Sequence, residues 1–117
     1  MTDVVIYHNP RCSKSRSTLA LIQEQGIEPT IVLYLEQPPG EQALTDILHK
    51  LGMQPRALLR RGEQEYKDLG LADTSLDDAS LVEAMCEHPR LIERPIVIAG
   101  DRAVIGRPPE NVLTLLD

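Results

Sequence analysis

The 117-residue sequence has only two cysteines, Cys12 and Cys86, which is too few for a disulfide framework. It has no apolar run near the roughly eighteen residues that a membrane-spanning helix needs. Its first residues lack a basic stretch followed by an apolar one, so the sequence predicts no signal peptide. We therefore expect a cytoplasmic protein away from the membrane, with one domain over residues 1–117, because this length is typical of a single core.

Positive charge is scarce and unusual in kind. The net charge of −6 disfavours binding to nucleic acid or to an anionic membrane. Nine of the twelve basic residues are Arg and only three are Lys. An Arg side chain presents a planar fork of donors that suits an oxyanion. Most of these arginines are expected to be solvated surface charges, but a few on loops can still hold an anion in one pocket.

The hydrophobic pattern predicts a β-α-β unit, then a group of helices, then a β-β-α unit. The predicted strands are 3–7, 30–34, 96–99 and 103–105. The predicted helices are about 13–25, 41–51, one beginning near Leu81 and one near Glu110, with short helical pieces over 53–80. A tight hairpin is expected at Gly100-Asp101. This order is typical of an α/β fold of the thioredoxin/glutaredoxin-like class, with a helical insertion at about residues 40–90 between its two halves.

Cys12 lies in the stretch HNPRCSKSR, where the first predicted strand leads into the first predicted helix. Unpaired N–H groups at a helix N-terminus stabilise a thiolate and so lower the pKa of the thiol. The neighbours His8, Arg11, Lys14 and Arg16 add positive or potentially positive charge. We therefore expect Cys12 to be a nucleophile at neutral pH. The alternative, a small buried apolar side chain, fits poorly with such polar neighbours.

Ser15 stands where a Cys-x-x-Cys redox enzyme has its second cysteine. Cys86 lies on the apolar stripe of a helix and is predicted to be part of the core, so no local thiol is expected to resolve an adduct on Cys12. Electrons must then come from an outside thiol such as glutathione or glutaredoxin. The Ser15 hydroxyl can donate a hydrogen bond to the Cys12 thiolate or to a bound anion.

His8 precedes Cys12 by four residues at the exit of the first strand. Its imidazole can stabilise the thiolate or shuttle a proton, and a strand-end histidine with no role is the alternative. The spacing of histidines and cysteines in the sequence matches no common metal site, so no metal is expected.

Three arginines far apart in the sequence are expected to surround this cysteine. In a thioredoxin-like fold, the residues before the third strand and those after the hairpin converge on the first strand–helix loop. This aims Arg94 and Arg107 at Cys12, and the Arg94-Pro95 bond is a candidate cis peptide. The helical insertion can bring Arg60 over the top. Three guanidinium groups and a helix N-terminus would then make a site for a tetrahedral oxyanion.

The sequence resembles the glutaredoxin-coupled arsenate reductase (ArsC) family. The matching pieces occur in order and cover nearly the whole chain: IYHNPRCSKSR, TIVLYLEQPP, ALLRRGEQEYKDLGL, LIERPIVI and the Arg107-Pro108 pair. Each piece alone is a moderate signal, and together they are specific.

The resemblance assigns roles to individual residues. The residues with an implied role are Cys12, His8, Ser15, Arg60, Arg94 and Arg107. The cysteine is implied to be the nucleophile, the histidine and the serine to tune its thiolate, and the three arginines to bind the oxyanion. Arg16 matches the basic residue that closes the loop motif.

The resemblance also implies a reaction. The thiolate of Cys12 attacks arsenic(V) in a bound arsenate, and a hydroxide or water leaves. Glutathione then attacks the arsenic adduct, glutaredoxin completes the two-electron reduction, and arsenite is released. The implied partners are arsenate, glutathione as co-substrate, and glutaredoxin. No bound cofactor is needed, and a monomer is the default expectation.

Two other functions stay open at the level of the sequence. The Cys-x-x-Ser pattern permits a glutathione-dependent thiol-disulfide oxidoreductase, although three arginines favour an inorganic oxyanion. The fold also resembles redox-sensing regulators that bind RNA polymerase. Those regulators usually carry a Cys-x-x-Cys switch, which Ser15 removes here.

Overall fold

The computed structural model describes residues 3–116 of the chain. The described chain divides into two compact units, one made of residues 3–37 and 94–116 and the other of residues 38–93. The expectation of a single domain with an insertion at about 40–90 stays a prediction. Within residues 3–116, every helix is too short or too polar to cross a lipid bilayer.

The first unit is built on a mixed four-stranded sheet with the strand order β2-β1-β3-β4. Its strands are β1 (Val4–Tyr7), β2 (Thr30–Val32), β3 (Ile96–Ala99) and β4 (Arg102–Ile105). β1 pairs parallel with β2 and antiparallel with β3, and β3 pairs antiparallel with β4. The turn between β3 and β4 uses a positive φ of 65° at Gly100, which glycine adopts at little cost. Four strands and a hairpin at the predicted places are thus confirmed, and only the second strand differs in its bounds by more than one residue.

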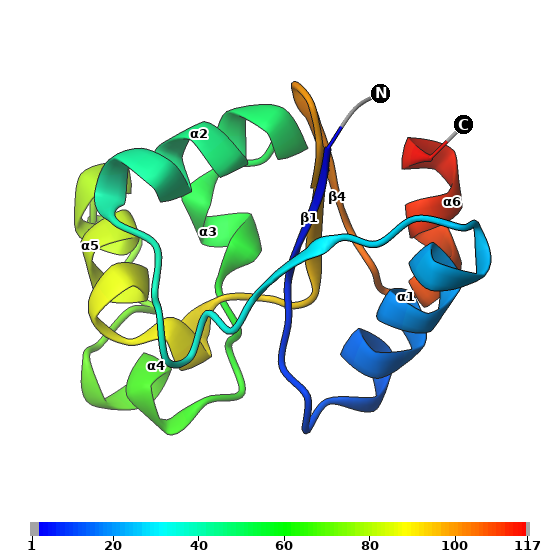
Figure 1. Cartoon of the computed structure of the whole chain (residues 1–117). Helices are drawn as coiled ribbons and strands as arrows, with labels where there is room; N and C mark the ends of the chain where they lie inside the picture. Colours follow the sequence, from blue (N-terminus) through cyan, green and yellow to red (C-terminus); the bar gives the residue numbers. More distant parts are fainter. Residues whose placement is uncertain (1–2, 117) are drawn as a thin grey trace. The chain divides into compact units, whose positions relative to one another are not determined.

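Helices cover one face of this sheet. The parallel β1–β2 pair needs a crossover, and α1 (Ser13–Glu24) supplies it. Figure 1 shows α1 beside α6 (Val112–Leu115), which follows a 3₁₀ turn, η2 (Pro109–Asn111). The buried side chains between these helices and the strands form one core: Val4, Ile6, Ile22, Val97, Val112 and Leu115. The β-α-β and β-β-α halves therefore share a single hydrophobic layer.

The second predicted strand is shorter than expected. It ends at Val32 instead of Tyr34, because the Leu33 carbonyl accepts the backbone N–H groups of Glu36 and Gln37, both at 2.9 Å, in a turn. The chain therefore leaves the sheet just after the point where His8 N–H donates to the Val32 carbonyl at 2.9 Å.

The second unit is helical. It contains α2 (Glu41–Leu51), α3 (Pro55–Leu58), α4 (Gln64–Asp68), α5 (Asp78–Glu87) and the 3₁₀ turn η1 (Pro89–Leu91). The bounds of α2 are those predicted from its apolar stripe, and Gly52 ends it with a φ of 67°. α5 begins earlier than the prediction near Leu81, because the Asp77 carboxylate accepts the Ser80 N–H at 2.9 Å and caps the helix there.

Candidate active site

Hydrogen bonds within the loop between β1 and α1 fix the position of Cys12. The Cys12 N–H donates to the Asn9 carbonyl at 3.0 Å, and the Cys12 carbonyl accepts the Arg16 N–H at 3.0 Å. The Asn9 side-chain oxygen accepts the Arg11 N–H at 3.0 Å, and an Arg16 guanidinium nitrogen donates to the Pro10 carbonyl at 2.9 Å. Cys12 is therefore held as the residue that precedes the first turn of α1.

The surroundings of the Cys12 sulfur favour the thiolate. Burial of the side chain, which is 9% exposed, acts to raise the pKa of Cys12. The backbone N–H groups of Ser15 and Lys14 and the charge and hydrogen bond of the Arg94 guanidinium act in the opposite direction. Together they outweigh burial and hold the pKa of Cys12 below its ordinary value. An N-terminal helix turn and one arginine thus meet at this sulfur.

The Ser15 hydroxyl bonds to its neighbours in the loop instead of the sulfur. Ser15 is fully buried, its Oγ lies 2.6 Å from His8 Nδ1, and it accepts the Asn9 N–H at 3.0 Å. Of the two predicted partners of this hydroxyl, the Cys12 thiolate interacts with the Ser15 backbone N–H instead, and the bond to a bound anion stays a prediction. The reason is geometric, because the third residue of a helix points its N–H toward the capping side chain.

His8 is buried next to this hydroxyl and is 6% exposed. Burial lowers the pKa of His8, and the nearby charge of Arg16 lowers it further. His8 is thus neutral at pH 7, so it contributes a hydrogen-bonding imidazole to the loop and no fixed positive charge.

Arg94 and Arg107 lie on the segments on either side of the β3–β4 hairpin, and Arg94 is the one that acts on the Cys12 sulfur. The Arg94-Pro95 peptide is cis, as predicted, and the Arg107-Pro108 peptide is also cis, which the sequence did not indicate to us. Both arginines belong to the same compact unit as Cys12. The Arg94 side chain is partly buried and the Arg107 side chain is exposed.

Gly106 packs the segment that carries Arg107 directly against α1. Its N–H donates to the Pro95 carbonyl at 2.9 Å, and its carbonyl accepts the buried Thr18 hydroxyl at 3.3 Å. A Cβ at this position would lie 2.9 Å from both Pro95 Cγ and Thr18 Cγ2, closer than carbon atoms approach. The first turns of α1, the residues around Pro95 and the start of the Arg107 segment therefore converge. Thr18 and Gly106 contribute to this contact, and neither was predicted from the sequence.

Arg60 lies in the second unit, so its membership of an oxyanion site stays a prediction. It follows an isolated antiparallel bridge between Leu59 and Ile92, and its N–H donates to the Leu91 carbonyl at 2.8 Å. Its guanidinium makes an ion pair with Glu63 at 3.4 Å. Neither Glu63 nor this pairing was identified from the sequence, because no helical periodicity links the two residues across a loop.

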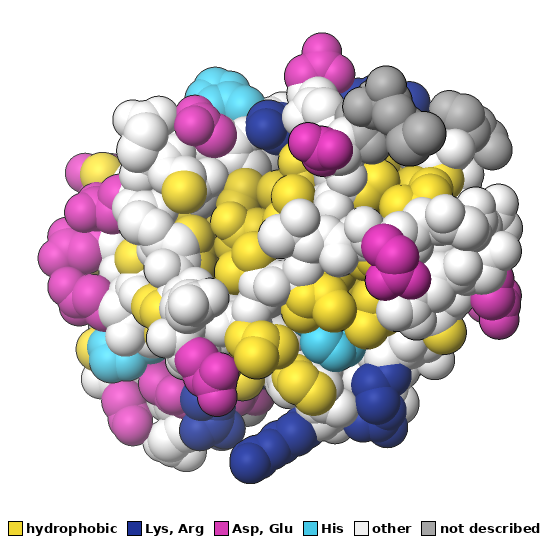
Figure 2. Space-filling model, viewed as in Figure 1, with side chains coloured by type: hydrophobic (Ala, Val, Ile, Leu, Met, Phe, Trp, Pro, Cys, Tyr) yellow, Lys and Arg dark blue, Asp and Glu magenta, His cyan; other side chains and the backbone are white. Residues whose placement is uncertain are grey.

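Cys86 is only partly buried, so the prediction that it belongs to the core is wrong in degree. Met85 takes the fully buried position on α5, and Cys86 lies at the flank of the stripe. Burial, and then the charges of Glu41 and Glu87, raise the pKa of Cys86. Figure 2 shows acidic side chains gathered on the α5 side of this unit.

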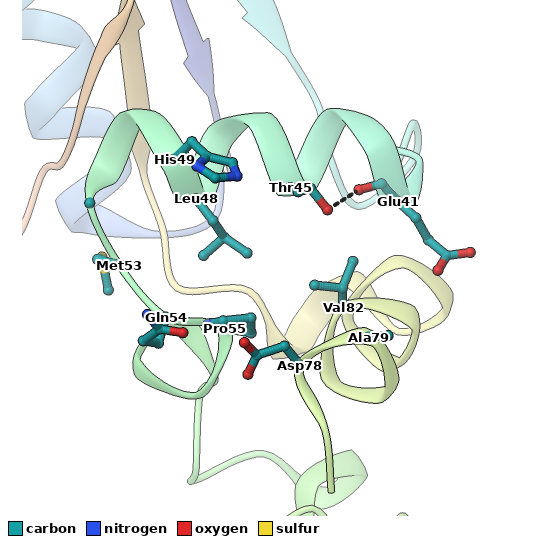
Figure 3. A pocket seen from close by; sticks show the side chains of 11 residues that line it. Glu41, Thr45, Leu48, His49, Met53, Gln54, Pro55, Asp78, Ala79 and Val82 are labelled. Carbon is teal, nitrogen blue, oxygen red and sulfur yellow. Dashed lines mark hydrogen bonds between the residues drawn. The ribbon is translucent and has the colours of Figure 1, made fainter.

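The second unit also contains a cavity of about 620 Å³ between α2, α5 and the start of α3. Leu48 from α2 and Val82 from α5 line it, with Asp78 at the end of α5 nearest Pro55 (Figure 3). None of the predicted site residues lines this cavity. Among residues 3–116, no group of three or more His, Cys, Asp and Glu side chains is arranged to hold a metal ion.

The chain is similar to known proteins over nearly its whole length. A family model described as "ArsC family" matches residues 7–115. The uncharacterized protein YfgD of Escherichia coli K12 is 55% identical, over 97% of this chain and 96% of that protein. An arsenate reductase of Haemophilus influenzae is 52% identical, over 97% and 98% of the two chains. The solved structure of an arsenate reductase from Vibrio cholerae is 52% identical, with a TM-score of 0.94 over 97% of each chain.

The sheet order and the cysteine at the start of α1 define a thioredoxin-like protein. Within that class, the chain belongs to the ArsC family.

Proposed function

We propose that this protein is an arsenate reductase. The observation that carries the proposal is the placement of the Arg94 guanidinium against the Cys12 sulfur at the N-terminus of α1, where the pKa of the thiol is lowered. A nucleophile and an oxyanion-binding group are then adjacent, as attack on a tetrahedral oxyanion requires. Relatives named arsenate reductase, at 52% and 46% identity, support the same assignment.

The reaction begins at the sulfur. The Cys12 thiolate attacks arsenic(V), a sulfur–arsenic bond forms, and a hydroxide or water leaves from the bound arsenate. Arg94, Arg107 and Arg60 bind the remaining oxygens and offset the charge that develops on them. The neutral His8, hydrogen-bonded to Ser15, keeps the loop in the geometry that holds the sulfur at the helix N-terminus.

Reduction needs two electrons that the cysteine alone does not supply. Glutathione attacks the arsenic of the Cys12 adduct and displaces a second hydroxide or water, and a glutaredoxin thiol then attacks the glutathione sulfur, which leaves the electron pair of that sulfur–arsenic bond on arsenic(III). The two thiols supply the two electrons and are oxidised to a mixed disulfide between glutathione and glutaredoxin, and water then displaces the Cys12 sulfur from arsenic(III), which releases arsenite. The only other cysteine in the sequence, Cys86, has a raised thiol pKa, which supports an outside source of electrons.

The need for an outside thiol also indicates where and with which partners we propose that the protein works. The protein acts in the cytoplasm, where reduced glutathione is present, and it works as a monomer without a bound cofactor or metal. Glutathione and glutaredoxin are transient partners in each cycle.

The test is arsenate-dependent oxidation of NADPH, with glutathione, glutaredoxin and glutathione reductase supplied. We expect turnover by the parent protein, its loss in Cys12→Ser, and its retention in the matched variant Cys86→Ser. Turnover that survives Cys12→Ser would rule out the mechanism. Turnover of a glutathione mixed disulfide, with none on arsenate, would select the thiol-disulfide oxidoreductase instead.

A further inference from the structure

Four charged side chains of the second unit form a chain of ion pairs that we call the Arg60 cluster: Arg60, Glu63, Glu65 and Arg90. One Glu63 oxygen lies 3.4 Å from Arg60 Nη2, and its other oxygen lies 3.2 Å from Arg90 Nη2. Glu65 lies 3.8 Å from Arg90 Nε. Glu63 therefore bridges Arg60 and Arg90, whereas Glu65 pairs with Arg90.

The backbone beneath Arg60 is fixed independently of this cluster. The Arg60 N–H donates to the Leu91 carbonyl at 2.8 Å, and the Glu93 N–H donates to the Leu58 carbonyl at 3.0 Å. Leu58 and Leu91 are fully buried. Only the side chain of Arg60 is thus left to be oriented, and its orientation depends on what its guanidinium contacts.

Two contacts hold one side of that guanidinium. Arg60 Nη2 is paired with Glu63, and Arg60 Nη1 donates to the Arg90 carbonyl at 3.4 Å. An arginine has five N–H donors, so these contacts leave donors for an anion. A long side chain that is already restrained loses less conformational entropy when it binds, which favours affinity.

A carboxylate beside an anion-binding arginine also has a cost, because it repels the anion. Glu63 is only 16% exposed, so its charge is weakly screened, but Arg90 contacts its second oxygen and offsets it. With Arg90 in place, Glu63 can orient Arg60 without cancelling its positive charge.

We propose that Glu63 is a positioning residue for Arg60 in oxyanion binding, and that Arg90 neutralises the carboxylate that does the positioning. This inference rests on the proposed function, since it takes Arg60 as an oxyanion ligand. It goes further in that it assigns a role to two residues outside the cysteine and the three arginines.

The test measures arsenate binding directly, through the concentration of arsenate that protects Cys12 from alkylation by iodoacetamide. We expect Glu63→Ala to weaken protection about two- to tenfold, the range for the loss of one restrained side chain. Arg90→Ala should weaken it as well, because Glu63 is left uncompensated. Glu83→Ala, which removes the same charge from an exposed residue of α5 outside the cluster, is the matched control and should leave protection unchanged.

A second background separates positioning from a general structural role. In Arg60→Ala, the further change Glu63→Ala should have no additional effect on protection, because the side chain that it orients is gone. The rate of alkylation without arsenate, which reports the Cys12 thiolate, should be the same with and without Glu63. Glu63→Gln keeps the size and one acceptor oxygen, so it should fall between the parent and Glu63→Ala, and it replaces the alanine variant if that variant does not fold.

The outcomes are distinct. Protection by arsenate that is unaffected by Glu63→Ala and Glu63→Gln, or weakened equally in the presence and absence of Arg60, overturns this inference and leaves the proposed function standing. A parent protein that shows neither protection by arsenate nor arsenate turnover overturns the proposed function, and the role of Glu63 with it.

Discussion

The start of α1 and the end of α5 each carry one cysteine, and the two regions shift the pKa of its thiol in opposite directions. Cys12 precedes the first turn of α1, where Ser15 and Lys14 present backbone N–H groups to the sulfur. Cys86 lies in the last turn of α5, where helix carbonyls carry partial negative charge, and Glu41 and Glu87 add full charges. The pKa of the first thiol is lowered and that of the second is raised.

Burial does not explain this difference. Cys12 is the more buried of the two, and burial by itself raises the pKa of either thiol. The partners reverse the order, since donors and a guanidinium surround one sulfur and carboxylates lie near the other. The polarity of the helix end and the sign of the neighbouring charge therefore decide which cysteine is a nucleophile.

The largest expected effect comes from removing the guanidinium at the Cys12 sulfur. In Arg94→Ala we expect the pKa of Cys12 to rise, because the charge and hydrogen bond that stabilise the thiolate are lost. The value of kcat/KM for arsenate should fall about 10²- to 10³-fold, as when one oxyanion donor is removed. Arsenate turnover and the pH dependence of Cys12 alkylation measure the two effects.

Arg102→Ala provides the control for this change. Arg102 is an exposed arginine of the same unit, and its guanidinium donates to the Thr114 carbonyl at 3.3 Å. Its removal should leave arsenate turnover and alkylation unchanged. Equal losses in Arg94→Ala and Arg102→Ala would mean that general charge, and no specific contact with the sulfur, supports activity.

A smaller effect separates the two cysteines in the unmodified protein. Since the thiolate is the reactive form, Cys12 should react with iodoacetamide at pH 7 about tenfold or more faster than Cys86. The rate at Cys12 should rise at lower pH than that of an ordinary cysteine, and the rate at Cys86 at higher pH. Peptide mass spectrometry of timed reactions gives both profiles, and equal rates would erase the contrast between the two helix ends.

The smallest expected effect is a change in the pKa of the Cys86 thiol when one neighbouring carboxylate is removed. Glu41→Gln removes a negative charge that raises the pKa of this thiol, so alkylation of Cys86 should begin at somewhat lower pH. Burial and Glu87 remain, so Cys86 should stay less reactive than Cys12. A pH profile for Cys86 identical to that of the parent would show that Glu41 does not act on the sulfur in solution.

The sequence predicted the elements whose signals are local. The break at Pro38-Pro39-Gly40, the apolar stripe of α2 and Gly52 after it predicted both ends of that helix. Continuous runs rich in β-branched residues predicted β1 and β3. The order of elements then led to the thioredoxin-like fold. The start of α5 was placed too late, because the Asp77 cap is a single side-chain contact with no periodicity.

The contacts that link distant parts of the chain could not be derived in this way. The Ser15 hydroxyl was expected to bond to the Cys12 thiolate or to a bound anion, but the choice between the sulfur and His8 depends on the path of the loop. Gly106 meets Thr18 and Pro95 only after β4 has paired with β3. The bridge by Glu63 between Arg60 and Arg90 likewise depends on how α4 and η1 approach each other.

The first unit is assembled from two stretches of chain that are separated by residues 38–93. This has a consequence for biosynthesis. When the ribosome has released only the first 93 residues, β1 has β2 as a neighbour but lacks β3, and the Cys12 sulfur lacks Arg94. The thiolate therefore gains its guanidinium partner, and β1 its second neighbouring strand, only when the residues from Arg94 onward emerge and fold back.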